Sequence, residues 1–169
     1  SRISVLTPNI KGFEGALAAG AQEIVIFGAA SEAFSQRNIN CSIAESIERF
    51  RPVAEAALAN GLRLRAAVSV AYGCPYQGEV PIESVVDVSR RFRDLGCHEI
   101  GIADTIGVAT GAQVQRVLEA VMREVVGDRT VDEIITIGRQ ESEKSALKRT
   151  RELADSLIPP DRVPRAVGI

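Results

Sequence analysis

The sequence predicts an α/β protein built on parallel strands, and two observations support that fold class. Short runs rich in Ile, Val and Leu alternate with longer segments whose apolar residues recur at helical spacing. In addition, a glycine stands just before a strand at A-A-G-A-Q-E-I, A-N-G-L-R-L and D-L-G-C-H-E-I. Strands that are joined by crossover helices pair in parallel. The pattern therefore fits either a piece of a (βα) barrel or an open doubly wound sheet.

Four strands and four helices are expected before the composition changes. The strands are expected at 3–6, 23–27, 62–70 and 99–103, the helices at 11–19, 42–59, 81–95 and 110–125, and a long loop at 28–40. Ser42 with Glu45, and Thr110 with Gln113, form capping boxes at the start of two of these helices. Gly20 stands where a helix end needs the left-handed backbone conformation.

The pattern changes where residues 1–125 end. Thr130 with Glu133 forms a further capping box, and the charged segment that follows is expected to be helical to about Leu157, before a Pro-Pro pair. Its apolar residues are sparse among many Lys, Arg and Glu, which is typical of a solvated or partner-bound helix. We therefore divide the chain into residues 1–125 and a charged helical tail, 126–169.

Composition excludes several classes of protein. The 169 residues are 46% hydrophobic with a net charge of -2, which suits one globular domain, or one and a fraction, and shows no charge excess for nucleic acid. No apolar run approaches the roughly 18 residues that a membrane span needs. Three cysteines without C-x-x-C spacing argue against a disulfide framework and a structural zinc site. The single histidine, His98, rules out any site that needs two imidazoles from this chain.

The stretch E-I-G-I-A-D-T-I-G-V, residues 99–108, holds the main candidate for chemistry. A short apolar strand ends there at Asp104, and a carboxylate at the carboxyl end of a parallel strand is placed to bind a ligand or a metal. The alternative is that Asp104 caps the next turn through its own backbone. No G-x-G-x-x-G follows a strand, which weakens a nucleotide-binding interpretation.

Five linked sequence patterns resemble one enzyme family. They are S-V-L-T-P-N, I-F-G-A-A-S-E, N-I-N-C-S-I, G-C-P-Y-Q-G and A-D-T-I-G-V. From about Ile3 to Val125 the chain is thereby similar to hydroxymethylglutaryl-CoA lyases. Isopropylmalate and homocitrate synthases share the same superfamily barrel, but N-I-N-C and G-C-P-Y favour the lyases. The resemblance implies strands three to six of a (βα)8 TIM barrel that cleaves 3-hydroxy-3-methylglutaryl-CoA into acetyl-CoA and acetoacetate, using Mg²⁺ or Mn²⁺.

Matched residue by residue, the resemblance makes Asp104 the catalytic candidate, near the reaction centre at the end of strand six. It places these residues in substrate-binding positions: Arg65, Glu32, Asn38, Asn40 and Cys74. Arg65 lies inside a strand and is alternatively a buried ion-pair partner. For Cys74 a structural role is favoured over a nucleophilic one. No residue of this chain is assigned as a metal ligand.

The departures from the family pattern limit what the chain is expected to do alone. The resemblance implies a strand-one arginine and aspartate, a strand-two glutamate, an H-x-H pair on strand seven, and a later cysteine and asparagine, none of which has a counterpart here. We therefore expect an incomplete metal site and weak or absent lyase activity. The alternatives are a non-catalytic half-barrel that serves assembly, and another acyl-CoA lyase or synthase of the same superfamily.

The tail shows a second, weaker resemblance. Residues 121–145 are similar to a segment of the stomatin, prohibitin and band-7 proteins, so 121–125 is expected to be a junction between two unrelated sequences. The expected partners are an acyl-CoA substrate and either a second copy of the chain or a complementing chain, with no nucleic acid and no membrane span. Bacterial cytoplasm or mitochondrial matrix is the expected location.

Overall fold

The computed structural model describes residues 3–125 together with two strands at 133–137 and 165–168. The strands are β1 (Ser4–Leu6), β2 (Glu23–Ala29), β3 (Arg63–Ser69), β4 (Glu99–Ala103), β5 (Glu133–Ile137) and β6 (Arg165–Gly168). The helices are α1 (Ile10–Ala18), α2 (Glu32–Ile39), α3 (Ile43–Ala59), α4 (Ile82–Asp94) and α5 (Gly111–Val125).

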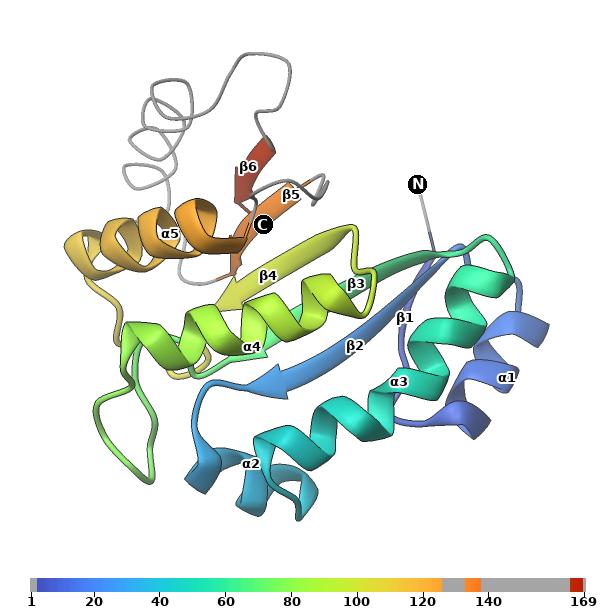
Figure 1. Ribbon diagram of the computed structural model, residues 1–169, viewed down its shortest axis with the longest axis horizontal. Coiled ribbons are helices and arrows are strands. Elements are labelled where there is room, and N and C mark those ends of the chain that lie inside the picture. The colour runs from blue at the N-terminus through green and yellow to red at the C-terminus, as the bar shows by residue number, and fades with distance from the viewer. Residues whose placement is uncertain (1–2, 126–132, 138–164, 169) are drawn as a thin grey trace.

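All six strands pair in parallel, in the order β1-β2-β3-β4-β5-β6. Helices α1, α3, α4 and α5 run along one side of this sheet (Figure 1). A doubly wound sheet would reverse its strand order at a switch point and carry helices on both faces. The sequential order and one-sided helices therefore decide for the barrel-type alternative. In the part of the chain that the structure describes, no helix is both long and apolar enough to span a membrane.

The core lies between the sheet and these helices. Alternate residues of the central strands are completely buried, as Ile26 of β2, Ala66 of β3 and Ile100 of β4 illustrate. The strand register aligns Ile26 with Ala66 and Ala66 with Ile100, so these side chains form one row on the same face. Phe92 of α4 packs onto that face over Gly28, where any side chain would meet the phenyl ring.

The expected helix starts in residues 1–125 are confirmed. Ser42 accepts a hydrogen bond from the Glu45 amide while the Glu45 carboxylate accepts one from the Ser42 amide, which completes the capping box of α3. Thr110 and Gln113 make the same reciprocal bonds at α5. Gly20 after α1 has φ of +78°, so the left-handed helix end is also confirmed.

Two elements differ from expectation. Residues Glu32–Ile39, expected within a loop, form α2, which Ser31 caps by accepting a hydrogen bond from the Phe34 amide. The tail helix is wrong over Glu133–Ile137, which form β5 and pair with β4. A β-branched run beside an open strand edge gains more from parallel pairing than from a capping-box start. The rest of the expected helix, to Leu157, lies outside the described residues.

The contact between Gly28 and Phe92 predicts an asymmetric response to alanine. A Cβ atom at Gly28 would lie 2.9 Å from Cζ of Phe92. The Phe92 ring is fully buried and cannot move aside. Gly28→Ala should therefore lower the free energy of unfolding by about 1–3 kcal/mol. Gly15→Ala is the matched control, because nothing lies within 4 Å of its Cβ position in α1. It should stabilise by roughly 0.5–1 kcal/mol, and urea denaturation measures both values.

Candidate functional site

Three segments meet at the carboxyl edge of the sheet, and we call them the carboxyl-edge segments: residues 30–42 after β2, 70–81 after β3 and 104–110 after β4. Ser31 Oγ lies 3.1 Å from Cys74 Sγ, which joins the first segment to the second. A Cβ atom on Gly73 would lie 2.9 Å from Val108 Cγ2, so the second and third segments are also in contact. The carboxyl edge of parallel strands is where α/β proteins place their ligand sites.

The thiol of Cys74 is buried and held by hydrogen bonds. Its sulfur accepts one bond from the Ser31 hydroxyl at 3.1 Å and one from the Tyr76 amide at 3.4 Å. Burial raises the pKa of this thiol, whereas the bonds from Ser31 and from the backbone of Tyr76 and Gln77 lower it. The hydrogen bonds together outweigh burial, so the pKa is below its ordinary value. Ser31 Oγ also lies 2.8 Å from Gln77 Oε1, which is a second acceptor for the single proton of this hydroxyl.

Asp104 organises its own turn. One carboxylate oxygen accepts a hydrogen bond from the Val108 amide and the other accepts one from the Ala109 amide, both at 3.0 Å. The Asp104 carbonyl also accepts a bond from the Gly107 amide at 3.2 Å. The side chain is half-buried at the end of β4, where the sequence predicted it. This geometry is that of the turn-capping alternative, and the catalytic assignment stays a prediction.

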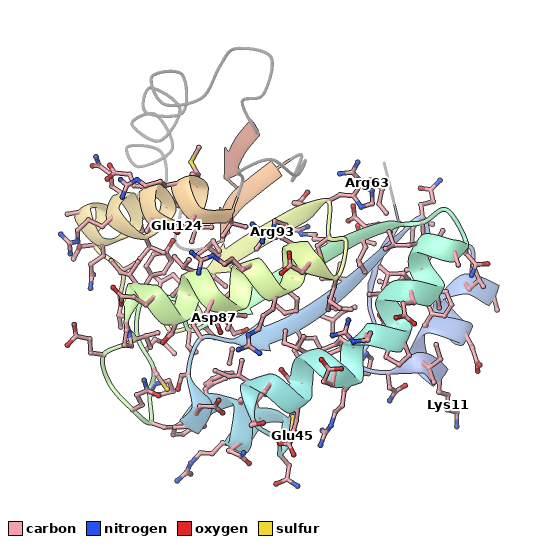
Figure 2. All side chains as sticks on the ribbon, in the orientation of Figure 1. Lys11, Glu45, Arg63, Asp87, Arg93 and Glu124 are labelled. Atoms are coloured by element: carbon pink, nitrogen blue, oxygen red, sulfur yellow. The ribbon has the colours of Figure 1, made fainter. Side chains whose placement is uncertain are left out.

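Arg65 does not lie at the carboxyl edge. Its Nε is 2.5 Å from Oε1 of Glu99, the first residue of β4, and both side chains are largely buried. Since Glu99 precedes Asp104 by five residues, Arg65 sits about 16 Å along the strands from that turn. Arg63 lies further still towards the amino end of β3 (Figure 2). The ion-pair alternative for Arg65 fits this geometry, and its substrate-binding role stays a prediction.

Glu32, Asn38 and Asn40 belong to α2 and its end. Glu32 is exposed and its carboxylate accepts a hydrogen bond from the Ile43 amide at 3.0 Å, which joins the first turn of α2 to the start of α3. Asn38 is exposed on α2. Asn40 caps that helix in the left-handed conformation, with φ of +52°. The three residues share the carboxyl-edge region, but no contact of theirs reaches Cys74 or Asp104 directly.

An aromatic and cationic stack lies beside Cys74. The guanidinium carbon of Arg37 is 4.7 Å from the ring centroid of Tyr76, and the Phe34 ring lies 6.1 Å from the same centroid. Tyr76 is half-exposed, at 52% of its surface. Such a cation and ring pair contributes about 0.5–1 kcal/mol at an exposed position. The stack therefore holds α2 against the segment 70–81.

Sequence reasoning missed Ser31 and Thr105. Ser31 is 1% exposed and connects α2 to Cys74, and Thr105 Oγ1 accepts a hydrogen bond of 2.7 Å from the Val70 amide. Each of these contacts joins residues that are far apart in the sequence, 43 positions for Ser31 and Cys74 and 35 for Val70 and Thr105. In the sequence, the one indication of these roles was position: Ser31 directly precedes α2, and Thr105 directly follows Asp104.

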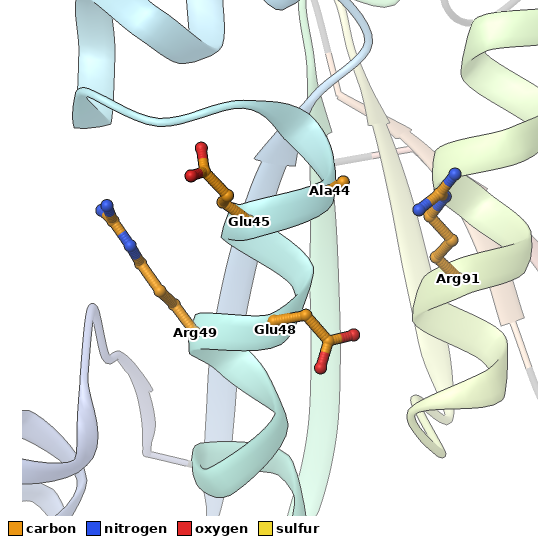
Figure 3. Close-up of a pocket in the computed structure, with 5 residues that line it drawn as sticks. All are labelled: Ala44, Glu45, Glu48, Arg49 and Arg91. Atoms are coloured by element: carbon orange, nitrogen blue, oxygen red, sulfur yellow. The ribbon is translucent and has the colours of Figure 1, made fainter.

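A shallow cavity of about 570 Å³ lies between α3 and α4. Its lining residues all come from α3 and α4 (Figure 3). They are Ala44, Glu45, Glu48, Arg49 and Arg91. Glu45 already serves the capping box of α3, and hydrogen bonding by Arg51 lowers the pKa of Glu48. None of the predicted site residues lines this cavity, so it does not mark the candidate site.

The residues at the carboxyl edge do not fit a metal ion by themselves. Within the described parts of the chain, no group of three or more His, Cys, Asp and Glu side chains is placed to hold one. Asp104 is the nearest candidate, but both of its oxygens already accept backbone hydrogen bonds. Mg²⁺ keeps several waters when it binds a protein, but it still requires one or two carboxylates that are free to coordinate it. No chemical step is therefore assigned here to a metal held by this chain.

Comparison with known families agrees with this architecture. The family model described as HMGL-like matches residues 2–136, which is most of the chain. The chain belongs to the HMGL-like family. The match runs past Val125 to residue 136. We expected the lyase-like region to end at 125 and residues 126–169 to have a separate origin. This division of the chain stays a prediction. The similarity of residues 121–145 to band-7 proteins is not supported by these matches.

Curated relatives carry lyase names. The chain is 51% identical over 126 residues to the 3-hydroxy-3-isohexenylglutaryl-CoA/hydroxymethylglutaryl-CoA lyase of Pseudomonas aeruginosa, covering 75% of this chain and 42% of that protein. It is 53% identical over 121 residues to the mitochondrial hydroxymethylglutaryl-CoA lyase of Homo sapiens, covering 72% of this chain and 37% of that protein. The chain thus spans about two fifths of the length of these relatives.

Solved structures support a partial TIM barrel. The HMG-CoA lyase of Brucella melitensis superposes with a TM-score of 0.84 at 38% identity, over 99% of this chain and 55% of that one. The hydroxymethylglutaryl-CoA lyase of Pseudomonas aeruginosa gives 0.81 at 39% identity, over 99% of this chain and 52% of that one. The chain therefore corresponds to about half the length of such a protein, and its six parallel strands form part of such a barrel.

The hydrogen bond between Ser31 and Cys74 predicts a pH-dependent effect. Ser31→Ala removes a donor from the sulfur, so the pKa of Cys74 should rise, which pH profiles of alkylation resolved by mass spectrometry can measure. Because the native pKa is lowered, the folded state binds fewer protons than the unfolded state just below the unfolded pKa. Stability therefore rises with pH through that window, and Ser31→Ala should reduce the rise.

Ser42→Ala is the matched control for Ser31→Ala. Ser42 caps α3 as Ser31 caps α2, but its hydroxyl bonds to Glu45 instead of to a cysteine. Both substitutions should cost about 1 kcal/mol through loss of a helix cap. Only Ser31→Ala should move the alkylation profile of Cys74. An equal shift in both variants would show that the hydroxyl of Ser31 does not set the pKa of the thiol.

Proposed function

We propose that β1 to β4 of this chain are strands three to six of a hydroxymethylglutaryl-CoA lyase-like barrel that cleaves 3-hydroxy-3-methylglutaryl-CoA into acetyl-CoA and acetoacetate, with β5 and β6 continuing the same parallel sheet. The observation that supports this most is the family match through residue 136, combined with carboxyl-edge segments that meet in one place. Catalytic groups of such barrels come from the ends of several strands at this face. Asp104 is the one carboxylate that the chain places at the end of β4.

The proposed reaction has two requirements that groups at the carboxyl edge of the sheet must meet. The tertiary hydroxyl loses a proton while the neighbouring carbon–carbon bond breaks, and negative charge develops on the thioester enolate. Asp104 is proposed to lie beside the reacting groups, in a turn that its own hydrogen bonds make rigid. The segment 70–81, with Tyr76 exposed on it, is proposed to face the acyl-CoA. Divalent metal chemistry, Mg²⁺ or Mn²⁺, belongs to the complete family site and is not assigned to this chain.

This chain is proposed to be weak or inactive alone. Positioning of reacting groups accounts for a large part of enzymatic rate enhancement, and a site that lacks several of its groups loses positioning as well as charge. Among the described residues, Asp104 is the one proposed catalytic carboxylate, and no three-ligand metal cluster is present. The remaining groups are proposed to come from a complementing chain or from further sequence of the same protein.

The test is complementation of the barrel. The full chain is mixed with the segments of the Pseudomonas aeruginosa lyase that precede and follow the matched region, and acetoacetate is followed with and without Mn²⁺. Turnover should appear only in the mixture. Asp104→Ala should lower it by about 100-fold or more, the loss typical of a positioned acid or base. Lys11→Ala, an exposed change on α1 (Figure 2), should leave it unchanged.

Two outcomes would contradict this proposal. Metal-dependent turnover by the chain alone would show that it assembles a complete site. A cooperatively folded mixture without turnover, in which both segments are demonstrably bound, would show that the lyase chemistry is absent. In the second case, related acyl-CoA substrates test the alternative of another lyase or synthase of the superfamily. For location, we propose bacterial cytoplasm or mitochondrial matrix.

The second candidate function is a non-catalytic half-barrel that assembles with a second copy. The supporting observation is that four exposed large apolar side chains gather at one edge of the sheet. They are Ile3 and Leu6 at β1, and Ile10 and Leu17 on α1. Leu6 alone exposes 58% of its surface. An edge strand with exposed apolar side chains is a template for pairing with another chain.

Sedimentation velocity tests this assembly. The chain should sediment as a dimer or larger oligomer, and Leu6→Lys should shift it to monomer, because a charge on a short edge strand blocks edge-to-edge pairing. Ile106→Lys is the control, since Ile106 is also exposed but belongs to the segment 104–110. A monomer at all concentrations would refute the assembly role.

A further inference from the structure

Val70 adopts a backbone conformation that its side chain disfavours. Its φ is +53°, in the left-handed region, and Asn40 is the only other non-glycine residue there in the described part of the chain. Asparagine tolerates this region, whereas a β-branched residue is a true outlier. Val70 is also completely buried. Strain of this kind persists only where surrounding contacts impose it, and it concentrates at functional sites.

The contacts that impose this conformation come from the end of β4. The Val70 amide donates a hydrogen bond to Thr105 Oγ1 at 2.7 Å. The next amide, that of Ala71, donates to the carbonyl of Ala103 at 3.2 Å. Two successive amides at the start of segment 70–81 are thus fixed to the two sides of Asp104. The chain leaves β3 in a direction that the residues around Asp104 determine.

The same two segments touch again further along. Gly73 leaves room for the Val108 methyl group, which a Cβ atom at position 73 would meet at 2.9 Å. The backbones of Cys74 and Gly78 then exchange two hydrogen bonds, of 2.8 and 2.9 Å, which close the loop between them. The segment 70–81 is therefore short, internally closed and attached to segment 104–110 at both Val70 and Gly73.

The geometry points to Thr105 as a positioning residue for the carboxyl edge. Its hydroxyl holds Val70 in the strained conformation and so fixes the loop that carries Cys74 and Tyr76 relative to Asp104. The structural role of Thr105 follows from these contacts alone. Its benefit for activity rests on the proposed function: Thr105 would keep the loop and Asp104 in one rigid arrangement around an acyl-CoA. Thr105 does not itself need to touch substrate for this role.

Two features indicate that the hydroxyl of Thr105, and not the size of its side chain, holds Val70 in place. Thr105 is an exposed residue, so its substitution opens no cavity in the core. Its Oγ1 is the atom that accepts the Val70 amide bond, and an amide left without that acceptor loses a bond at a buried position. Serine keeps the oxygen and valine keeps the shape. Thr105→Ser and Thr105→Val therefore separate the two contributions.

Alkylation of Cys74 reports the position of the loop without any substrate. Cys74 and Cys97 are both free and buried, and Cys97 lies after α4 in the core, where burial raises its pKa. With N-ethylmaleimide at fixed pH, Thr105→Val should increase the labelling rate of Cys74 by roughly tenfold, as expected for local opening after loss of one buried hydrogen bond. Thr105→Ser should label like the unmodified chain. Cys97 should label at an unchanged rate in both variants.

A change of the strained residue tests the physical cause. Glycine enters the left-handed region freely, whereas alanine does not. In a Val70→Gly background the effect of Thr105→Val on Cys74 labelling should be clearly smaller, because the backbone amide still loses its acceptor but little strain remains to be released. In the matched Val70→Ala background the roughly tenfold effect should persist. The two backgrounds differ by one methyl group, and both remove the two γ-methyl groups of Val70 from the core.

Each other outcome would overturn the inference. Equal acceleration at Cys74 and Cys97 would show that Thr105 stabilises the whole fold, and unchanged labelling of Cys74 in Thr105→Val would show that the hydroxyl holds nothing. An effect of equal size in the glycine and alanine backgrounds would refute strain as the cause. Because the labelling uses no substrate, a failure of lyase activity leaves these results intact, and a failure here leaves the lyase proposal intact.

Discussion

The in-register parallel pairing of β2, β3 and β4 is the constraint on which the rest of this structure depends. It places Ile26, Ala66 and Ile100 in one buried row beneath the helices. A slip of one residue in any strand would turn that row to the opposite face. The same register brings the ends of three strands to one edge. The contacts of Ser31 with Cys74 and of Thr105 with Val70 exist only because the core aligns these strands.

The carboxyl edge is built mainly from bonds between side chains and backbone amides. Asp104 accepts bonds from two amides, Glu32 from one, Thr105 from one and Cys74 from one. Such bonds rigidify loops that would otherwise leave polar backbone groups without partners as they leave the sheet. One of them, from the Val70 amide to Thr105, also holds Val70 in a left-handed conformation. The edge thus stores strain that the apolar core beneath it compensates.

Local patterns in the sequence predicted what local forces decide. The glycine at position 20 and the two capping boxes act within one helical turn, so their residues sufficed to predict those helix ends. Helix α2 escaped prediction because its eight residues bury only Ser35 and show no apolar stripe. Residues 133–137 became a strand because β4 offers them a pairing edge, which no local pattern reveals. The positions of Asp104 and Cys74 followed from strand ends, but their partners across the edge did not.

The proposed partner would find its best contact at the β1 edge and not on the open face of the sheet. That face carries charges which the chain already pairs: Arg65 with Glu99, and Arg63 with Glu23, whose carboxylate also accepts a bond from the Ser4 hydroxyl. Pairing satisfies groups whose burial would otherwise be costly. The β1 edge instead exposes Leu6 beside backbone groups that can accept another strand. A chain or segment that continues the barrel would therefore gain most by adding to β1.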